Sequence, residues 1–298
     1  MTLAPAPPRS ERAAVLRAAL WMMGAVLSFS SMAVAGRAVS FELDTFEIML
    51  YRSIVGFVIV LGLAAFTGGW ITITARRPGA HLLRNLCHFT GQNLWFYALT
   101  VIPLAQVFAL EFTAPLWVLI LSPLVLGERL TPMRALAAVI GFTGILIVAR
   151  PSPETLTAGT LAAAAAAIGF AGSILMTKRL TRTETLTCIL FWMTLMQIAF
   201  GVICAGHDGA IALPSPATLP WLGLIGCAGL VAHYCLTTAL SIAPATVVVP
   251  VDFLRLPLIA VIGLLVYGEQ IEPAVILGAA VIFGANYLNL WSETRKRY

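Results

Sequence analysis

The hexapeptide GERLTP at residues 127–132 returns as GEQIEP at residues 268–273, 141 positions later (268 − 127). Each copy follows an apolar run, LILSPLVL in the first case and IGLLVY in the second. The first copy carries the base Arg129, whereas the second carries the acid Glu272. A repeated frame that adds a base in one copy and an acid in the other suggests one structural unit used twice, on opposite sides of a boundary.

The composition identifies that boundary as a membrane. The chain has 298 residues, of which 60% are hydrophobic and only 10% are charged. A soluble domain carries about 25% charged residues, so a soluble core could not hide this much apolar surface. The net charge of +5 is modest and unevenly placed. It favours an anionic membrane surface over nucleic acid as a partner.

A spanning helix needs about 20 mainly apolar residues. The loop signals between apolar runs are charged segments, such as TKRLTRTET at 177–185, and Pro-rich or Gly-rich segments. Two connections, TVIP at 100–103 and SIAP at 241–244, are short enough to predict tight hairpins. The candidate spans are 17–36, 45–66, 79–99, 103–125, 132–150, 158–177, 186–206, 219–241, 244–267 and 273–292.

Lys and Arg residues predict the orientation. With ten spans, both termini lie on the same side of the membrane. A cytoplasmic position for the termini places most of the 18 Lys and Arg residues inside, Arg84, Arg129 and Lys178 among them. Only Arg37 and Arg150 then lie outside. The predicted topology is therefore N-in, C-in, in the cytoplasmic (inner) membrane.

The offset of 141 extends beyond the hexapeptide, because Pro103 and Pro244, and Phe112 and Phe253, match without a gap. Each repeat holds five spans, and since five is odd the second repeat enters the membrane upside down. The predicted fold is an all-α integral membrane protein of ten transmembrane helices, arranged as two inverted five-helix repeats. The predicted segments are an N-terminal tail at 1–16, repeats at 17–150 and 158–292, a linker at 151–157 and a basic C-terminal tail at 293–298.

The most specific stretches of the two halves are LTVIPLAQVFALEFTAPLWVLILSPLVLGERL, followed by GFTG, and the parallel ALSIAPATVVVPVDFLRLPLIAVIGLLVYGEQ. Through them the chain, from about residue 17 to residue 291, resembles the drug/metabolite transporter superfamily of EamA type. The last span departs from the first copy by carrying Asn286 and Asn289. The resemblance implies a secondary carrier for small metabolites, commonly an exporter, with its cavity between the two repeats.

Four charged residues fall inside the apolar spans: Arg52, Glu111, Asp252 and Arg255. Burying a charge in a membrane helix costs roughly 2.5–3.5 kcal/mol even on insertion scales, so each is a candidate functional residue. Glu111 and Asp252 match at the offset (252 − 111), each eight residues beyond a span-opening proline. They could bind a proton or a cationic group near the midplane. The alternative is structural, with Arg52 opposite Glu111 and Arg255 one turn from Asp252.

A second matched pair is Gln92 and His233 (233 − 92). Both could hydrogen-bond a polar substrate, or could simply join helices. His88, Gln92 and Trp95 share one helical stripe at i, i+4 and i+7. Trp95 and Tyr234 are aromatic candidates for the substrate site, although aromatic residues in spans more often pack or face lipid.

Two further patterns concern helix geometry. Prolines inside the spans, such as Pro115 and Pro257, remove backbone hydrogen bonds and predict kinks in the helices that carry the carboxylates. The small-residue run AAAAAAIGFAGS at 162–173 predicts a close helix approach.

These features favour a secondary active transporter that moves a small organic metabolite, such as an amino acid or a nucleoside-like or flavin-like compound, by alternating access. Protons are a candidate coupling ion. An intramembrane enzyme or a channel is the alternative, but no HExxH, GxSxG or filter-like repeat is present. No cofactor or metal site is expected, since the five cysteines lack ligand spacing and suggest small buried residues. Either a monomer or a homodimer is compatible with the sequence.

Overall fold

The computed structural model describes residues 9–127, 132–150, 156–242, 251–252 and 254–295, and these contain helices but no strand. The all-helical prediction is confirmed for this part of the chain. The helices are α1 (Arg9–Val39), α2 (Thr45–Thr67), the short 3₁₀ helix η1 (Gly69–Thr72), α3 (Pro78–Val101), α4 (Leu104–Glu111), α5 (Ala114–Leu126), α6 (Pro132–Ala149), α7 (Ala158–Leu180), α8 (Leu186–Ala205), α9 (Leu219–Ile242), α11 (Arg255–Tyr267) and α12 (Pro273–Arg295).

Six helical segments among the described residues are long and apolar enough to cross a membrane, and α6, α11 and α12 supply shorter apolar helices. The helix α3, which also has the length of a span, belongs to neither group. It carries His81, Arg84, His88 and Gln92, and all four side chains are buried inside the bundle. The polar side chains of this long helix therefore face the bundle interior, while Leu82, Leu83 and Leu86 are exposed, as expected for a multi-pass membrane protein with a polar interior.

The expected span at 103–125 is broken into α4 and α5. The cause is Pro115, which has no N–H to donate to the carbonyl of Glu111, four residues earlier. Asn286 of α12 donates from Nδ2 to the carbonyl of Phe112 at the break, at 3.0 Å. The predicted kink is confirmed here, and Asn286 acquires a role as the donor that satisfies a freed carbonyl. The equivalent stretch in the second half includes residues 243–250 and 253, which lie outside the described residues.

The glycines of the two hexapeptides end their helices in the same way. Gly127 follows α5 with φ 70°, and Gly268 follows α11 with φ 66°. This left-handed conformation is strained for residues that carry a Cβ, so glycine is the residue that can stop the helix here. In each half a proline, Pro132 or Pro273, begins the next helix.

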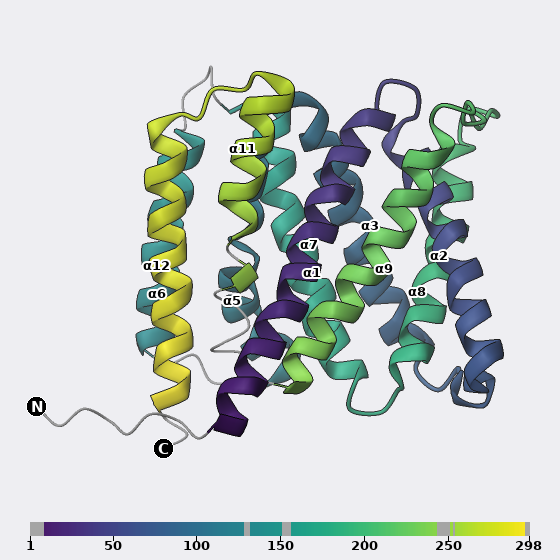
Figure 1. Ribbon diagram of the computed structural model, residues 1–298, viewed down its shortest axis with the longest axis horizontal. Coiled ribbons are helices and arrows are strands. Elements are labelled where there is room, and N and C mark those ends of the chain that lie inside the picture. The colour runs from purple at the N-terminus through teal and green to yellow at the C-terminus, as the bar shows by residue number, and fades with distance from the viewer. Residues whose placement is uncertain (1–8, 128–131, 151–155, 243–250, 253, 296–298) are drawn as a thin grey trace, which may run out of the picture.

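The two halves have matching helices at the offset of 141. The bounds of α5 and α11 differ by that number at both ends (255 − 114 and 267 − 126). The strongest packing pairs are α1 with α9, α3 with α7, α2 with α8 and α6 with α12. Under the offset, α1–α9 becomes α7–α3, and the other two pairs map onto themselves. We call the end of the bundle where α1 begins and α12 finishes the terminal end; α5 finishes there, whereas α11 finishes at the far end (Figure 1).

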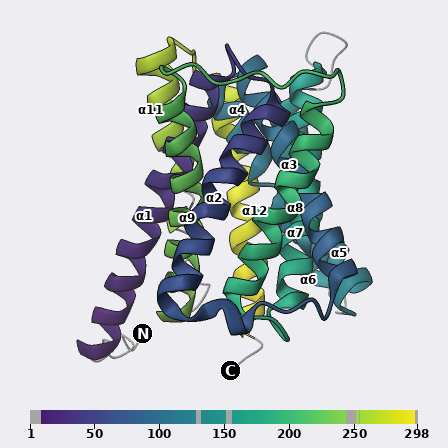
Figure 2. The same cartoon turned by 90° about the vertical axis from the view of Figure 1, so that its right-hand side faces the viewer.

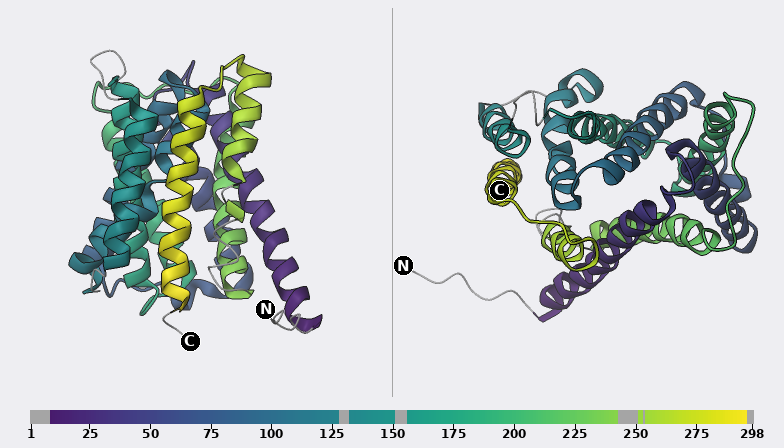
Figure 3. Two further views of the ribbon diagram at one scale, coloured as in Figure 1. Left: turned by 90° about the vertical axis from the view of Figure 1, so that its left-hand side faces the viewer. Right: turned by 90° about the horizontal axis from the view of Figure 1, so that it is seen from above.

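The helices surround a central region (Figure 3), with α6 and α12 on one side and α2 and α8 on the other. The chain passes from α2 to α3 along the terminal end, through η1 (Figure 2). The expected close approach of the run at 162–173 is confirmed where α7 meets α3. A Cβ on Gly169 would come within 2.9 Å of the Cys87 carbonyl oxygen and the Gly91 Cα, so a larger residue would push the helices apart.

Both terminal helices extend past the expected spans. The helix α1 begins at Arg9, within the predicted tail at 1–16, and α12 continues to Arg295, within the predicted tail at 293–298. Cys188 and Cys235 are buried, as expected, but Cys227 is exposed, so the prediction of buried cysteines is wrong there. Cys227 lies on the same outward stripe of α9 as Leu224, and in a membrane protein that apolar stripe meets lipid rather than water.

Candidate functional site

Arg255, the first residue of α11, stands at the centre of a buried charge cluster. Its Nη1 lies 3.1 Å from Oε1 of Glu111, the last residue of α4, and its Nη2 lies 3.0 Å from Oδ2 of Asp252. The indole Nε1 of Trp95 donates to Oε2 of Glu111 at 2.8 Å. The break between α4 and α5 leaves Glu111 at a helix end, where its side chain can reach the other half. The Arg255 guanidinium therefore forms ion pairs with two carboxylates, one from each half of the chain.

Three phenylalanine rings surround the same guanidinium. The carbon at its centre lies 4.9 Å from the Phe29 centroid, 5.4 Å from that of Phe108 and 4.9 Å from that of Phe112. These distances are within the roughly 6 Å range of a cation–π contact. Within the described structure Nε of Arg255 and Oδ1 of Asp252 are buried without hydrogen-bond partners. The cluster therefore retains one donor and one acceptor that a bound molecule could use.

A second, basic cluster lies between α2, α3 and α9. Arg52 of α2 donates from Nη1 to Oε1 of Gln92 at 2.8 Å and to the Met49 sulfur at 3.4 Å. Arg84 of α3 donates from Nη1 to Oδ1 of Asn85 at 2.8 Å and from Nε to Oγ1 of Thr177 at 3.1 Å. Both arginines are buried, and neither forms an ion pair within the described residues. This cluster holds excess positive charge in the interior.

Two histidines complete the basic cluster and connect it with the acidic one. His88 and His233 lie within electrostatic range of both Arg52 and Arg84. His233 packs edge-on against Phe29, with ring centroids 5.7 Å apart, and Phe29 also contacts Arg255. The two clusters therefore form one continuous polar and aromatic interior.

The described cavities differ in what they could hold. A pocket of about 20 Å³ beside Arg52, lined also by Thr194, Gln197 and Gly229, has room for about one water molecule. A larger cavity of about 380 Å³ lies between α4, α11 and α12, and its lining is almost entirely apolar. The pocket with polar walls is therefore too small for a metabolite, and the pocket with enough room has apolar walls. A metabolite that reached Arg52 would need the surrounding helices to move.

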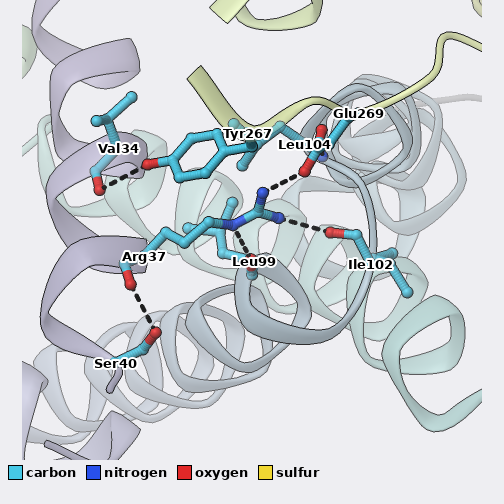
Figure 4. Close-up of polar contacts among 8 residues, drawn as sticks. All are labelled: Val34, Arg37, Ser40, Leu99, Ile102, Leu104, Tyr267 and Glu269. Carbon is cyan, nitrogen blue, oxygen red and sulfur yellow. Dashed lines mark hydrogen bonds and ion pairs between the residues drawn. The ribbon is translucent and has the colours of Figure 1, made fainter. Parts of the chain in front are cut away.

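A further cluster joins the halves at the far end of the bundle (Figure 4). Arg37 of α1 forms an ion pair with Glu269, the acid of the second hexapeptide. Its Nε donates to the Leu99 carbonyl at 2.5 Å and its Nη2 to the Ile102 carbonyl at 2.7 Å, while Glu269 accepts from the Leu104 N–H at 2.9 Å. We call Arg37 and Glu269, with these backbone partners, the far-end latch.

Arg37 also lies over the ring of Tyr267, with 4.8 Å between its guanidinium carbon and the ring centroid. The side chains of Arg37 and Glu269 are only 11% and 15% exposed. The latch therefore connects α1, the α3–α4 connection and the end of α11 in one closed contact.

The structure brings together most of the residues predicted from sequence. Glu111, Asp252, Arg255 and Trp95 meet in the acidic cluster, and the expected local pair of Asp252 with Arg255 is present. Arg52, Gln92, His88 and His233 gather in the basic cluster. The expected pairing of Arg52 with Glu111 is wrong: among the described residues Glu111 pairs with Arg255 instead.

Tyr234, an aromatic candidate for the substrate site, faces away from both clusters. Its side chain is 59% exposed and meets Trp21 of α1 edge-on, with ring centroids 5.7 Å apart. Successive helical residues turn by about 100°, so His233 can face the interior while Tyr234 faces outward. Tyr234 continues the outward stripe of α9 that includes Leu224, Cys227 and Val231.

Sequence reasoning missed Phe29, Arg84 and the far-end latch. The charge rule places Arg84 on the cytoplasmic side, but Arg84 lies inside the expected span at 79–99 and is only 5% exposed. The signal for Phe29 was its match with Phe170 at the offset (170 − 29), and Phe170 packs against His88 at 6.3 Å between ring centroids. Glu269 was part of the hexapeptide, but its partner Arg37 lies 232 residues away.

Comparison with known proteins gives one family, matched over two segments of the chain, and several relatives. The EamA-like transporter family matches residues 16–150 and 157–291. The S-adenosylmethionine uptake transporter of Rickettsia bellii (strain RML369-C) is 26% identical over 275 residues, covering 92% of this chain and 94% of the relative. Riboflavin transporters of Rhizobium johnstonii and Vibrio cholerae serotype O1 are each 31% identical, covering 93% and 94% of this chain and 92% and 95% of the relatives.

A solved structure that is 19% identical has the same fold, with a TM-score of 0.63 over 94% of this chain and 99% of that chain. The fold, the buried polar residues and the family match all indicate a multi-pass membrane transporter. The chain is a membrane transporter rather than an enzyme, and it belongs to the EamA-like transporter family within the drug/metabolite transporter superfamily.

Proposed function

We propose that the protein is a secondary active transporter that carries a small organic metabolite across the cytoplasmic membrane by alternating access. The observation that carries this proposal is the buried contact of Arg255 with Glu111 and Asp252, which joins the two halves of the bundle. Buried charges in membrane helices are costly and mark transport pathways. A static scaffold would not need them.

The proposed architecture has two inverted repeats of five spanning helices, with both termini in the cytoplasm. The equal offsets of α5 and α11, and their endings at opposite ends of the bundle, support this arrangement. In this topology the terminal end is cytoplasmic and the far end faces outward. A reporter fused within 207–218 should then report the exterior, and a cytoplasmic signal there would contradict the topology.

We infer that the substrate has a flat heteroaromatic ring and a polar tail. Relatives at 26–31% identity are named as transporters of S-adenosylmethionine or riboflavin, and both compounds have such a ring and tail. The phenylalanines around Arg255 offer stacking partners. Arg52 and Arg84, which have no carboxylate partner among the described residues, suit an anionic or acceptor-rich group such as a carboxylate or a ring carbonyl.

The far-end latch supports a conformation closed toward the exterior. Because it joins α1, α3 and α11 through one ion pair and several backbone contacts, opening on that side requires the latch to break. The pocket beside Arg52 then has to widen for a metabolite to bind. Both steps are movements of whole helices, the kind of motion that alternating access requires.

Uptake by proteoliposomes tests the proposal directly. Labelled riboflavin and S-adenosylmethionine are the first probes, each with and without an imposed pH gradient. We expect saturable movement of at least one probe or of a close analogue, competed by the unlabelled compound and absent from empty liposomes. A purified, folded protein that neither moves nor binds any compound in a broad metabolite screen would contradict the proposal.

A further inference from the structure

A group of potential metal ligands lies at the terminal end of the bundle, separate from the clusters described above. It consists of His81 in the first turns of α3, Glu184 in the α7–α8 connection and Cys188 in the first turn of α8. Their ligand atoms, an imidazole nitrogen, a carboxylate oxygen and the thiol sulfur, all lie within 4.8 Å of one another. Two chain segments far apart in the sequence, the start of α3 and the stretch at 184–188, therefore meet at one point.

The hydrogen bonds around this point are incomplete. His81 is fully buried, yet neither of its ring nitrogens has a hydrogen-bond partner among the described residues. The Oε1 atom of Glu184 is also buried and unpartnered. Buried polar atoms usually have partners, so these three positions are suited to binding a ligand.

The remaining contacts hold the ligands in place. The Oε2 atom of Glu184 accepts from the Thr74 hydroxyl at 2.7 Å, and the Thr74 carbonyl accepts from Trp192 Nε1 at 2.7 Å. Among the described residues, the hydrogen bonds of the Cys188 sulfur, with the Thr74 backbone and with Glu184, are all 3.4 Å long. Glu184 is therefore fixed through one oxygen while its other oxygen stays open, which is the arrangement of an oriented metal ligand.

We propose that His81, Glu184 and Cys188 bind a divalent transition-metal ion, with Zn²⁺ the best chemical match. Sulfur, nitrogen and oxygen donors together suit zinc, which is usually tetrahedral, and water would take the fourth position. Bonds of about 2.0–2.3 Å require the donors to move closer together than 4.8 Å, through small side-chain rotations. Binding releases the thiol proton to solvent, because the thiolate is the ligand form.

The spacing explains why the sequence did not predict this site. His81 and Glu184 are 103 residues apart (184 − 81), and only Glu184 and Cys188 are near neighbours. No short motif connects the three. The site also has nearby positive charge, since Arg84 acts electrostatically on His81 and Arg76 on Glu184. This positive charge disfavours binding of a cation. The negative charges of the Glu184 carboxylate and the Cys188 thiolate offset it.

The proposal has a mechanical consequence. The ion would join α3 to α8 at the terminal end, and α3 also carries Arg84, His88, Gln92 and Trp95 of the interior clusters. Bound metal should therefore restrain the helix that holds much of the proposed substrate site. We expect zinc to raise the thermal midpoint of the protein and to slow transport.

Cobalt binding to the untagged, full-length protein in detergent tests the site. Co²⁺ should bind at one equivalent and give a thiolate-to-cobalt charge-transfer band, which Zn²⁺ then abolishes. Cys188→Ser should remove the band, and His81→Gln and Glu184→Gln should each weaken binding at least tenfold. The matched controls Cys87→Ser, on the same helix α3, and His207→Gln, at an exposed loop position, should bind like the wild type.

The metal measurement does not depend on transport, so its failure is distinguishable from failure of the proposed function. If Cys188→Ser does not fold, Glu184→Gln and His81→Gln still decide the result, because neither removes the thiol. Absence of the band in the folded wild type, or wild-type affinity in both of these variants, would overturn the proposal.

Discussion

Arg255 and Glu111 are 144 residues apart in the chain, yet Nη1 and Oε1 lie 3.1 Å apart in the interior of the bundle. Asp252 holds a second nitrogen of the same guanidinium at 3.0 Å. With all three groups ionised, the cluster carries one excess negative charge. A proton on Glu111, or a cationic substrate group, would neutralise it and leave the Arg255–Asp252 pair intact. This imbalance is the physical basis that we propose for proton coupling.

The first prediction concerns Glu111→Gln. Glutamine keeps an oxygen for the Trp95 N–H and leaves Arg255 paired with Asp252, so the fold should be retained, with a thermal midpoint within about 4 °C of the wild type. Because glutamine cannot titrate, proton-driven accumulation should be lost while downhill exchange continues. Accumulation, exchange and thermal midpoint are measured on the same preparation.

Asp252→Asn is the matched control. It leaves the Glu111–Arg255 pair in place, so proton-driven accumulation should persist if Glu111 is the coupling residue. Accumulation at the wild-type level in Glu111→Gln would exclude the coupling role. Loss of every transport mode together with a large fall in thermal midpoint would instead identify a structural ion pair.

The second prediction concerns Arg52. If Arg52 binds an acceptor group of the substrate, Arg52→Met should weaken substrate binding at least tenfold, since a hydrogen bond to a charged group contributes about 1.5–3 kcal/mol. Arg179→Met is the control, because Arg179 is an exposed base in the last turn of α7. Isothermal titration or substrate-induced thermal shift gives the comparison. Equal affinity in the two variants would remove Arg52 from the substrate site.

The sequence could predict features that follow from local composition or from the repeat. Apolar length gave the helices, and the offset of 141 gave the equivalence of Gly127 with Gly268. The position of Pro115 predicted the kink that separates α4 from α5. His88, Gln92 and Trp95, which the spacing places on one helical stripe, are all buried. Each of these results depends on neighbours within one helix or on a fixed register.

Contacts between distant helices were not predictable in this way. The choice of Arg255 over Arg52 as the partner of Glu111 depends on how α2, α4 and α11 rotate about their axes. The rotation of α9 about its axis likewise determines that Tyr234 faces outward. A single sequence indicates which residues share a helical face, but not the angle at which two helices pack. It therefore does not determine which residues far apart in the chain form a contact.

The third prediction concerns pH. Glu42, in the α1–α2 connection, accepts hydrogen bonds from the Thr218 hydroxyl and from both the N–H and the hydroxyl of Ser215, and these bonds lower its pKa. The folded state therefore prefers the carboxylate. Docking of the 206–218 connection onto Glu42 should be fully present above the ordinary glutamate pKa and be lost as the pH falls through the lowered value.

Hydrogen exchange over residues 211–218, corrected for the intrinsic rate, measures this docking. The wild type should lose protection on acidification, whereas Glu42→Gln should already be less protected at neutral pH and change less. The control is Asp208→Asn, in the same connection, because Asp208 accepts a hydrogen bond from the nearby Ala210 N–H and none from Ser215 or Thr218 among the described residues. An unchanged acid profile in Glu42→Gln would show that these hydrogen bonds do not hold the connection.

The fourth prediction concerns the far-end latch. Arg37→Met leaves Glu269 without its charged partner, and loss of one member of a buried pair costs about 3–5 kcal/mol. That cost falls only on conformations closed at the far end, so the population should shift toward opening there. A cysteine at Met32, which is buried on the same helix α1 toward the interior, should become labelled faster by an impermeant maleimide applied from outside. Labelling at the wild-type rate would mean that the latch is not a barrier.

The last prediction uses the repeat to test the latch from the other side. Lys178 lies 141 residues after Arg37 (178 − 37), in the last turn of α7 at the terminal end. If inverted repeats close the two sides alternately, Lys178 should stabilise closure at the terminal end as Arg37 does at the far end. Lys178→Met should then favour opening at the terminal end and slow outside labelling of the cysteine at Met32, the reverse of Arg37→Met. The neighbouring Arg179→Met controls for general loss of positive charge. Faster outside labelling in both Lys178→Met and Arg37→Met would contradict this. It would show that the variants loosen the whole bundle, and do not shift it between a conformation closed at the far end and one closed at the terminal end.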